Sequence, residues 1–182
     1  MSVTLVKPNQ LDLLSLDDVK RHLRIEHPHE DEYIKTLIYS ATDLVEKYIG
    51  RSLLIKTWCL TWHTKGRKGV EEIPLPNPPL VDIEKVDVVS KDHVRLPVRR
   101  YGLDTSGQIP ILSCLVREAI VEVFYQSGYS ETPRHVPAAI RQAALLAVGD
   151  LYENRINCKI QAHSLFQLLL QPYVVRSLGV DS

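Results

Sequence analysis

The chain has 182 residues, of which 45% are hydrophobic and 24% are charged. This composition is that of a folded globular protein and excludes a disordered one, and the length suits one domain with an insertion or two small domains. Lys plus Arg and Asp plus Glu both number 22, so the zero net charge gives no overall attraction to nucleic acid or to anionic membranes.

The three cysteines, Cys59, Cys114 and Cys158, lie far apart and form no Cys or His pair at metal-ligand spacing. Their pattern argues against a zinc module or a disulfide framework and favours buried free thiols. The first residues lack a charged region followed by an apolar one, and no stretch approaches the roughly 20 apolar residues of a membrane span. We therefore expect a soluble protein made in the cytoplasm, with no membrane partner.

Two helices are predicted near the start, over 16 to 24 and 30 to 49. Ser15 and Asp18 form a capping-box-like start for the first, and an acidic run from Glu30 to Glu32 suits the positive end of the second. The second helix carries one broad apolar stripe at helical spacing and ends at Gly50.

Residues 55 to 130 change period and are predicted to form an all-β insertion. In the run KTWCLTWHT, Trp58, Leu60 and Trp62 alternate with smaller residues, the pattern of a half-buried strand. Further strands are predicted over 70 to 73, 81 to 89, 93 to 96, 109 to 112 and 119 to 125.

The stretch PLPNPPLV, residues 74 to 81, holds four of the eleven prolines. Each ring fixes φ and removes a backbone donor, so the segment is extended and rigid and cannot occupy a helix interior or a central strand. Because apolar side chains alternate with the rings, we expect it to pack, and we place it at the seam between the helices and the β insertion.

A third helix is predicted over 137 to 154, with Pro137 in the favoured first turn. Its apolar residues cover nearly every direction, with Arg141 and Gln142 as the polar interruptions, so it should be buried on all sides. One face is expected to meet the first two helices, and the other to be covered by the β insertion or by another subunit. The apolar tail after Cys158 contains a short helical turn ended by Pro172 and is expected to be a docking segment.

These elements predict an α+β fold with a three-helix core, an all-β insertion between the second and third helices, and a short C-terminal docking segment. The expected division is a helical core of residues 1 to 54 plus 131 to 182, and a β insertion of residues 55 to 130.

Four groups of residues are candidates for a metal, phosphate, nucleic-acid or ligand site. The segment from His27 to Glu32 is dense in potential metal ligands, yet it suits a polar loop that enters a helix. The basic turn at 65 to 69 lacks the phosphate-loop pattern, and Arg99 with Arg100 is the kind of pair found on any charged face. Trp58 and Trp62 could stack a ligand but are typical of a core. No GxSxG elbow is present. We therefore expect no catalytic residues and no metal.

Short motifs in fixed order along nearly the whole chain resemble the head-tail connector (adaptor, head completion) family of tailed bacteriophages and prophages. They are Leu16–Lys20, His22–Ile25, Glu30-Asp31, Tyr33-Ile34, Ala41, Val45-Glu46, Gly50–Leu53, Ile73–Pro76, Pro78–Leu80, Val123–Tyr125, Gly128-Tyr129, Val136-Pro137, Ala143, Leu151–Arg155, Leu169-Leu170 and Pro172-Tyr173. The tail departs from the family pattern by placing Arg176 three residues after Tyr173.

The resemblance implies a virion structural protein of the neck, without enzymatic activity or cofactor. It implies a ring under the portal protein that follows the portal's twelve subunits and joins the DNA-filled head to the next neck or tail component. The partners it implies are the portal, that next component, other copies of this chain, and genomic DNA in passing through the channel.

On this basis the C-terminal segment is expected to dock on the portal through Leu165, Leu168, Leu169, Tyr173 and Arg176. The β insertion is expected to face a neighbour or the tail. Ring contacts are expected at Leu145, Leu146 and Tyr152, any of which would serve equally in the core. The alternatives left open are a small α+β protein that binds nucleic acid or another ligand, and a hydrolase whose site assembles only in space.

Overall fold

The structure is a computed structural model that describes residues 1–64, 69–90, 94–116, 120–154 and 164–176. It confirms the predicted α+β fold. The chain divides into two compact units, which are described separately below. The β unit consists of Met1–Asn9 and Ile55–Tyr129, and the helical unit of Gln10–Leu54 with Ser130–Ser182. Among the described helices, none is long and apolar enough to cross a membrane.

The helical unit contains the three predicted helices at nearly the predicted bounds: α1 (Leu16–Leu23), α2 (Asp31–Ile49) and α3 (Ala138–Glu153). The Ser15 hydroxyl accepts a hydrogen bond from the backbone N–H of Asp18 and so caps α1. Gly50 ends α2 with φ at 67°, a left-handed conformation that glycine adopts at little cost.

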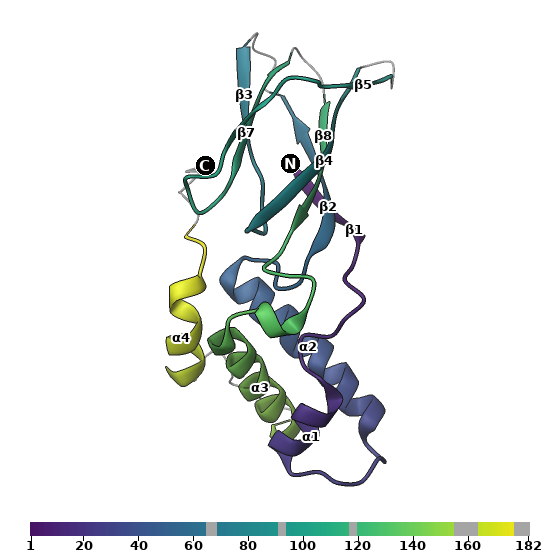
Figure 1. Cartoon of the computed structure of the whole chain (residues 1–182), viewed down its shortest axis with the longest axis vertical. Helices are drawn as coiled ribbons and strands as arrows, with labels where there is room; N and C mark the ends of the chain where they lie inside the picture. The colour runs from purple at the N-terminus through teal and green to yellow at the C-terminus, as the bar shows by residue number, and fades with distance from the viewer. Residues whose placement is uncertain (65–68, 91–93, 117–119, 155–163, 177–182) are drawn as a thin grey trace. The chain divides into compact units, whose positions relative to one another are not determined.

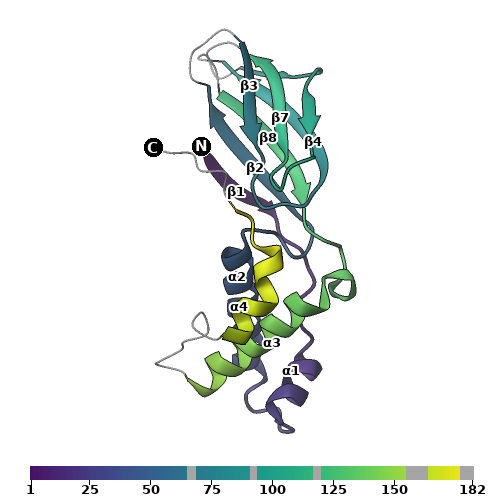
Figure 2. The same cartoon turned by 90° about the vertical axis from the view of Figure 1, so that its left-hand side faces the viewer.

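The short helix α4 (Ser164–Leu170) packs against α3 and covers part of its apolar surface. The all-round apolar helix packs against α2, α4 and α1 of its own unit (Figure 2). Part of the cover that α3 needs therefore comes from its own unit, while Leu145 and Leu146 stay half-buried. The 3-10 turns η1 (Pro133–His135) and η3 (Gln171–Tyr173) precede α3 and follow α4.

The β unit is built from two antiparallel sheets (Figure 1). One has the order β1-β2-β8-β4-β5 and the other the order β3-β7-β6. The strands are β1 (Ser2–Lys7), β2 (Lys56–His63), β3 (Gly69–Pro74), β4 (Leu80–Val89), β5 (Arg95–Pro97), β6 (Gly102–Asp104), β7 (Ile111–Val116) and β8 (Ile120–Ser127).

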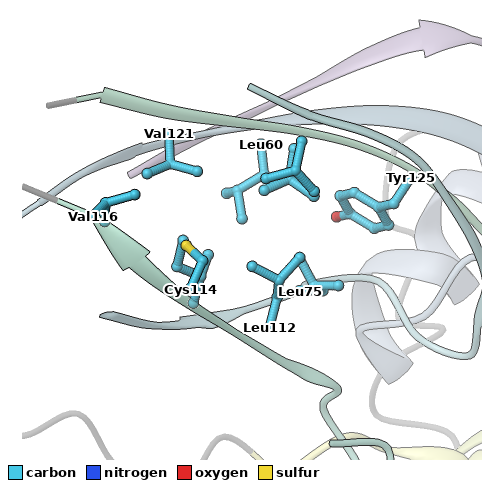
Figure 3. Packing of buried hydrophobic residues seen from close by; sticks show 10 residues of the cluster. Leu60, Leu75, Leu112, Cys114, Val116, Val121 and Tyr125 are labelled. Atoms are coloured by element: carbon cyan, nitrogen blue, oxygen red, sulfur yellow. The ribbon is translucent and has the colours of Figure 1, made fainter. Parts of the chain in front are cut away.

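A hydrophobic core lies between the facing residues of these two sheets, as Figure 3 shows. Leu60 and Tyr125 enter it from the larger sheet, and Leu112 and Cys114 from the smaller one. Trp58 and Trp62 pack against its edge, where the alternation of their strand places them. The Tyr125 hydroxyl, deep in this core, donates a hydrogen bond of 2.9 Å to the carbonyl of Pro76.

Two strands were not predicted. The N-terminal β1 pairs antiparallel with β2, so residues 1 to 9 belong with the β unit and not with the helices as expected. The three-residue β6 adds an edge to the smaller sheet.

The proline-rich stretch belongs to the β unit. It connects β3 of the small sheet to β4 of the large one. Its Leu75 is buried, and the Leu75 N–H donates to the Pro110 carbonyl at 2.8 Å. The fixed φ of its prolines suits a rigid connector between the two sheets.

Candidate functional site

The C-terminal helix α4 is anchored to the helical unit by two fully buried side chains. Phe166 and Leu170 are both completely shielded from solvent, and the Phe166 ring meets the Tyr48 ring of α2 edge-on, with centroids 5.3 Å apart. Burying two large apolar side chains contributes several kcal/mol. One face of α4 is therefore part of the fold of its own chain.

The segment that follows α4 is fixed to the end of α2 by two hydrogen bonds. The Arg51 Nε donates to the Tyr173 carbonyl at 2.6 Å, and the Val175 N–H donates to the Ile49 carbonyl at 2.8 Å. A side chain at Gly50 would lie 3.5 Å from the Val175 Cβ. The tail thus returns to the point where α2 ends.

The five residues predicted to dock on a portal fall into two groups in this geometry. Leu165 and Leu168 are 51% and 66% exposed on the outer face of α4. Leu169 and Tyr173 are half-buried, and the exposed Arg176 already interacts within the chain. The exposed pair of leucines is the apolar surface that α4 leaves uncovered.

The three residues predicted to make ring contacts do not share one surface. Leu145 and Leu146 are half-buried on α3, and only Leu145 lines a groove. The Tyr152 hydroxyl donates to the Glu30 carboxylate at 2.5 Å, and its ring lies 6.3 Å from that of Tyr33. Tyr152 therefore already has a role within its own helical unit.

The groove beside Leu145 has a volume of about 850 Å³ and lies entirely in the helical unit. Segments distant in sequence form it: residues 11 to 15 and the exposed side of α1, the turn η1, and the first half of α3. The lining residues are Leu11, Asp12, Leu13, Leu14, Ser15, Asp18, Arg21, His22, Pro133, Arg134, Arg141 and Leu145. Sequence reasoning missed this groove because no single segment carries its pattern.

The segment from His27 to Glu32 serves packing between helices. Asp31 forms an ion pair of 2.7 Å with Lys20 of α1, and Glu30 accepts the hydrogen bond of Tyr152. In the described part of the chain, no group of three or more potential ligands is placed to hold a metal ion. These side chains are the polar helix entrance that the sequence pattern also allowed.

The two tryptophans and the described cysteines are buried or half-buried in the β unit. Trp58 and Trp62 line the β core, and the Trp62 Nε1 donates to Glu71 at 3.4 Å. Burial raises the pKa of the Cys59 and Cys114 thiols, which keeps them protonated near neutral pH. Arg99 and Arg100 are exposed; Cys158 and the basic turn at 65 to 68 lie outside the described residues.

A family model for head completion proteins matches residues 12–161, which is most of the chain. The chain belongs to the head completion protein family. This family is one of structural proteins. No curated protein matches the chain.

Solved structures from gene transfer agent (GTA) particles resemble this head completion protein in fold. A chain from the neck of an empty GTA particle, computed with C6 symmetry, has a TM-score of 0.83 at 19% identity, over 98% of each chain. A chain from the virion of a native GTA particle has a TM-score of 0.81, again at 19% identity and over 98% of each chain. One from the neck of the native particle, computed with C12 symmetry, has a TM-score of 0.75 at the same identity and coverage.

Proposed function

We propose that this head completion protein is a non-enzymatic component of a virion neck. It assembles there as a ring of twelve copies under the portal. The ring joins the DNA-filled head to the next neck or tail component. The observation that carries the proposal is the family match over residues 12–161. It is supported by a fold shared over 98% of the chain with chains from GTA necks computed with C6 and C12 symmetry. Because such a ring encloses the path of the genome, passing contact with DNA belongs to the proposal.

The exposed face of α4 supports a portal-docking role for the C-terminal segment. Phe166 and Leu170 already provide the burial that holds α4 in place, so folding does not require large apolar residues at Leu165 and Leu168. Exposed apolar residues held on a fixed helix are typical of a helix that lies in a partner's groove. We assign the first contact with the portal to these two leucines, with Leu169, Tyr173 and Arg176 beside them.

Point variants test this assignment better than a deletion, because removing α4 would also uncover Tyr48 and α3. We expect Leu165→Ser with Leu168→Ser to leave the helical content unchanged and to weaken binding to purified portal rings by about tenfold or more. Val70→Ser, at a side chain 65% exposed in the β unit, is the matched control and should bind as the unaltered chain does. Equal binding by both variants would contradict the assignment.

A further inference from the structure

The groove of the helical unit combines apolar walls with an excess of basic groups. Leu11, 52% exposed, and Leu145 line it together with Arg134 and Arg141. Arg21 also lines it but already lies 3.8 Å from Asp18, which in turn accepts a hydrogen bond from Ser15. The two other arginines therefore carry most of the positive charge that a partner could meet.

Arg141 has a hydrogen-bond donor without a partner in the described part of the helical unit. Its Nε is buried, and within the described residues nothing accepts a hydrogen bond from it. A buried guanidinium donor without an acceptor is costly, and an incoming carboxylate would remove that cost. The groove thus favours a partner that brings an acidic side chain next to an apolar or aromatic one.

The outward face of α2 has this chemistry. Tyr39 is 58% exposed there, and Asp43 follows it by one helical turn on the same face. In the described part of the chain Asp43 makes no ion pair, whereas Glu32 on that face is already paired with Lys35 at 2.7 Å. The exposed Lys47, one turn beyond Asp43, adds a positive charge at the C-terminal end of this face.

The groove and the outward face of α2 are complementary in charge, because each carries acidic and basic side chains that match those of the other. Asp43 suits Arg134 and Arg141, while Lys47 suits the exposed Asp12 in the groove lining. An arginine guanidinium also stacks well on a tyrosine ring. No residue of α2 lines the groove, so one helical unit presents the groove and the α2 face as separate surfaces.

Two different complementary surfaces on one unit are what a head-to-tail contact requires, and such contacts form a ring when the rotation between neighbouring copies closes. We propose that the groove of one copy receives the α2 face of the next copy, with Tyr39 against Leu11 and Leu145 and with Asp43 against Arg134 and Arg141. This inference rests on the proposed ring and names the surfaces that build it. It retains Leu145 from the predicted ring contacts and adds residues that sequence reasoning missed.

Photo-crosslinking tests the contact directly. With p-benzoylphenylalanine in place of Leu11, irradiation of the assembled protein should give a covalent dimer whose crosslinked peptide comes from α2, and the same probe at Val70 should not. A ring seen by light scattering whose Leu11 crosslinks reach another segment, or the portal, would overturn the contact while leaving the ring intact. A chain that stays monomeric both alone and with portal rings would overturn the proposed ring, and this contact with it.

Charge exchange provides a second test that does not depend on the probe. Arg134→Glu and Asp43→Arg are both at exposed positions and should each raise the concentration for half-assembly by about tenfold. The double variant should recover part of that loss, because the pairing of positions 43 and 134 is restored with its signs reversed, while Arg141 loses its acidic partner. Asp82→Arg, an exposed acid of the β unit, is the control and should leave assembly unchanged. Additive losses in the double variant would contradict the pairing.

Discussion

Replacing Phe166 by alanine tests the anchoring of the C-terminal helix, on which its role in docking depends. The ring is fully buried and lies edge-on against Tyr48 with centroids 5.3 Å apart. Removing a buried phenylalanine costs about 3–5 kcal/mol, and because α4 is short we take the lower figure of about 3 kcal/mol. With a urea dependence of about 2 kcal/mol per molar, the unfolding midpoint should fall by about 1.5 M.

Circular dichroism at 222 nm during urea unfolding measures this change, since the helices dominate the signal. Leu168→Ala is the matched control on the same helix: its side chain is 66% exposed, so the free energy of unfolding should change by less than about 0.5 kcal/mol. If both variants unfolded at the same urea concentration, Phe166 would not hold α4 in place, and the docking surface described for α4 would lose its support.

Three further predictions concern buried groups and backbone strain. Tyr125→Phe removes the hydrogen bond to Pro76 and should cost about 1–2 kcal/mol, measured by urea unfolding through the fluorescence of the two tryptophans, both in the β unit; an unchanged midpoint would contradict it. Gly50→Ala places a side chain at φ 67° and near Val175, so the thermal unfolding should show a loss of about 1–2 kcal/mol, whereas a gain would refute the argument. Burial raises the pKa of Cys59 and Cys114, so less thiolate is present at any given pH. In a Cys158→Ser variant these two thiols should react with a disulfide reagent at pH 8 about a hundredfold more slowly when the protein is folded than in urea. Similar rates would contradict the burial.

The helices could be predicted from the sequence because each carries its own boundary signals. Ser15 caps α1, and Gly50 ends α2 after a continuous apolar stripe, so the expected bounds lie within about two residues of those observed. The larger strands were found for the same reason: alternation in the run around Trp58 is a local pattern.

The missed elements depend on distant parts of the chain. The strand β1 forms because its backbone pairs with β2, more than 50 residues later, and its own residues are exposed with little alternation. The cover that α4 gives to α3 depends on Phe166 reaching Tyr48, which no local pattern encodes. The groove likewise joins α1 to η1 and α3 across more than 100 residues. Such pairings appear only once the fold is known.

The most direct test of the central claim is the mass of the purified protein bound to portal rings, measured by light scattering or native mass spectrometry. The proposed ring predicts a discrete complex in which twelve copies of the 20.7 kDa chain are added to each portal ring. A chain that remains monomeric beside the portal, or that adds in no fixed number, would contradict the assignment as a ring-forming neck component.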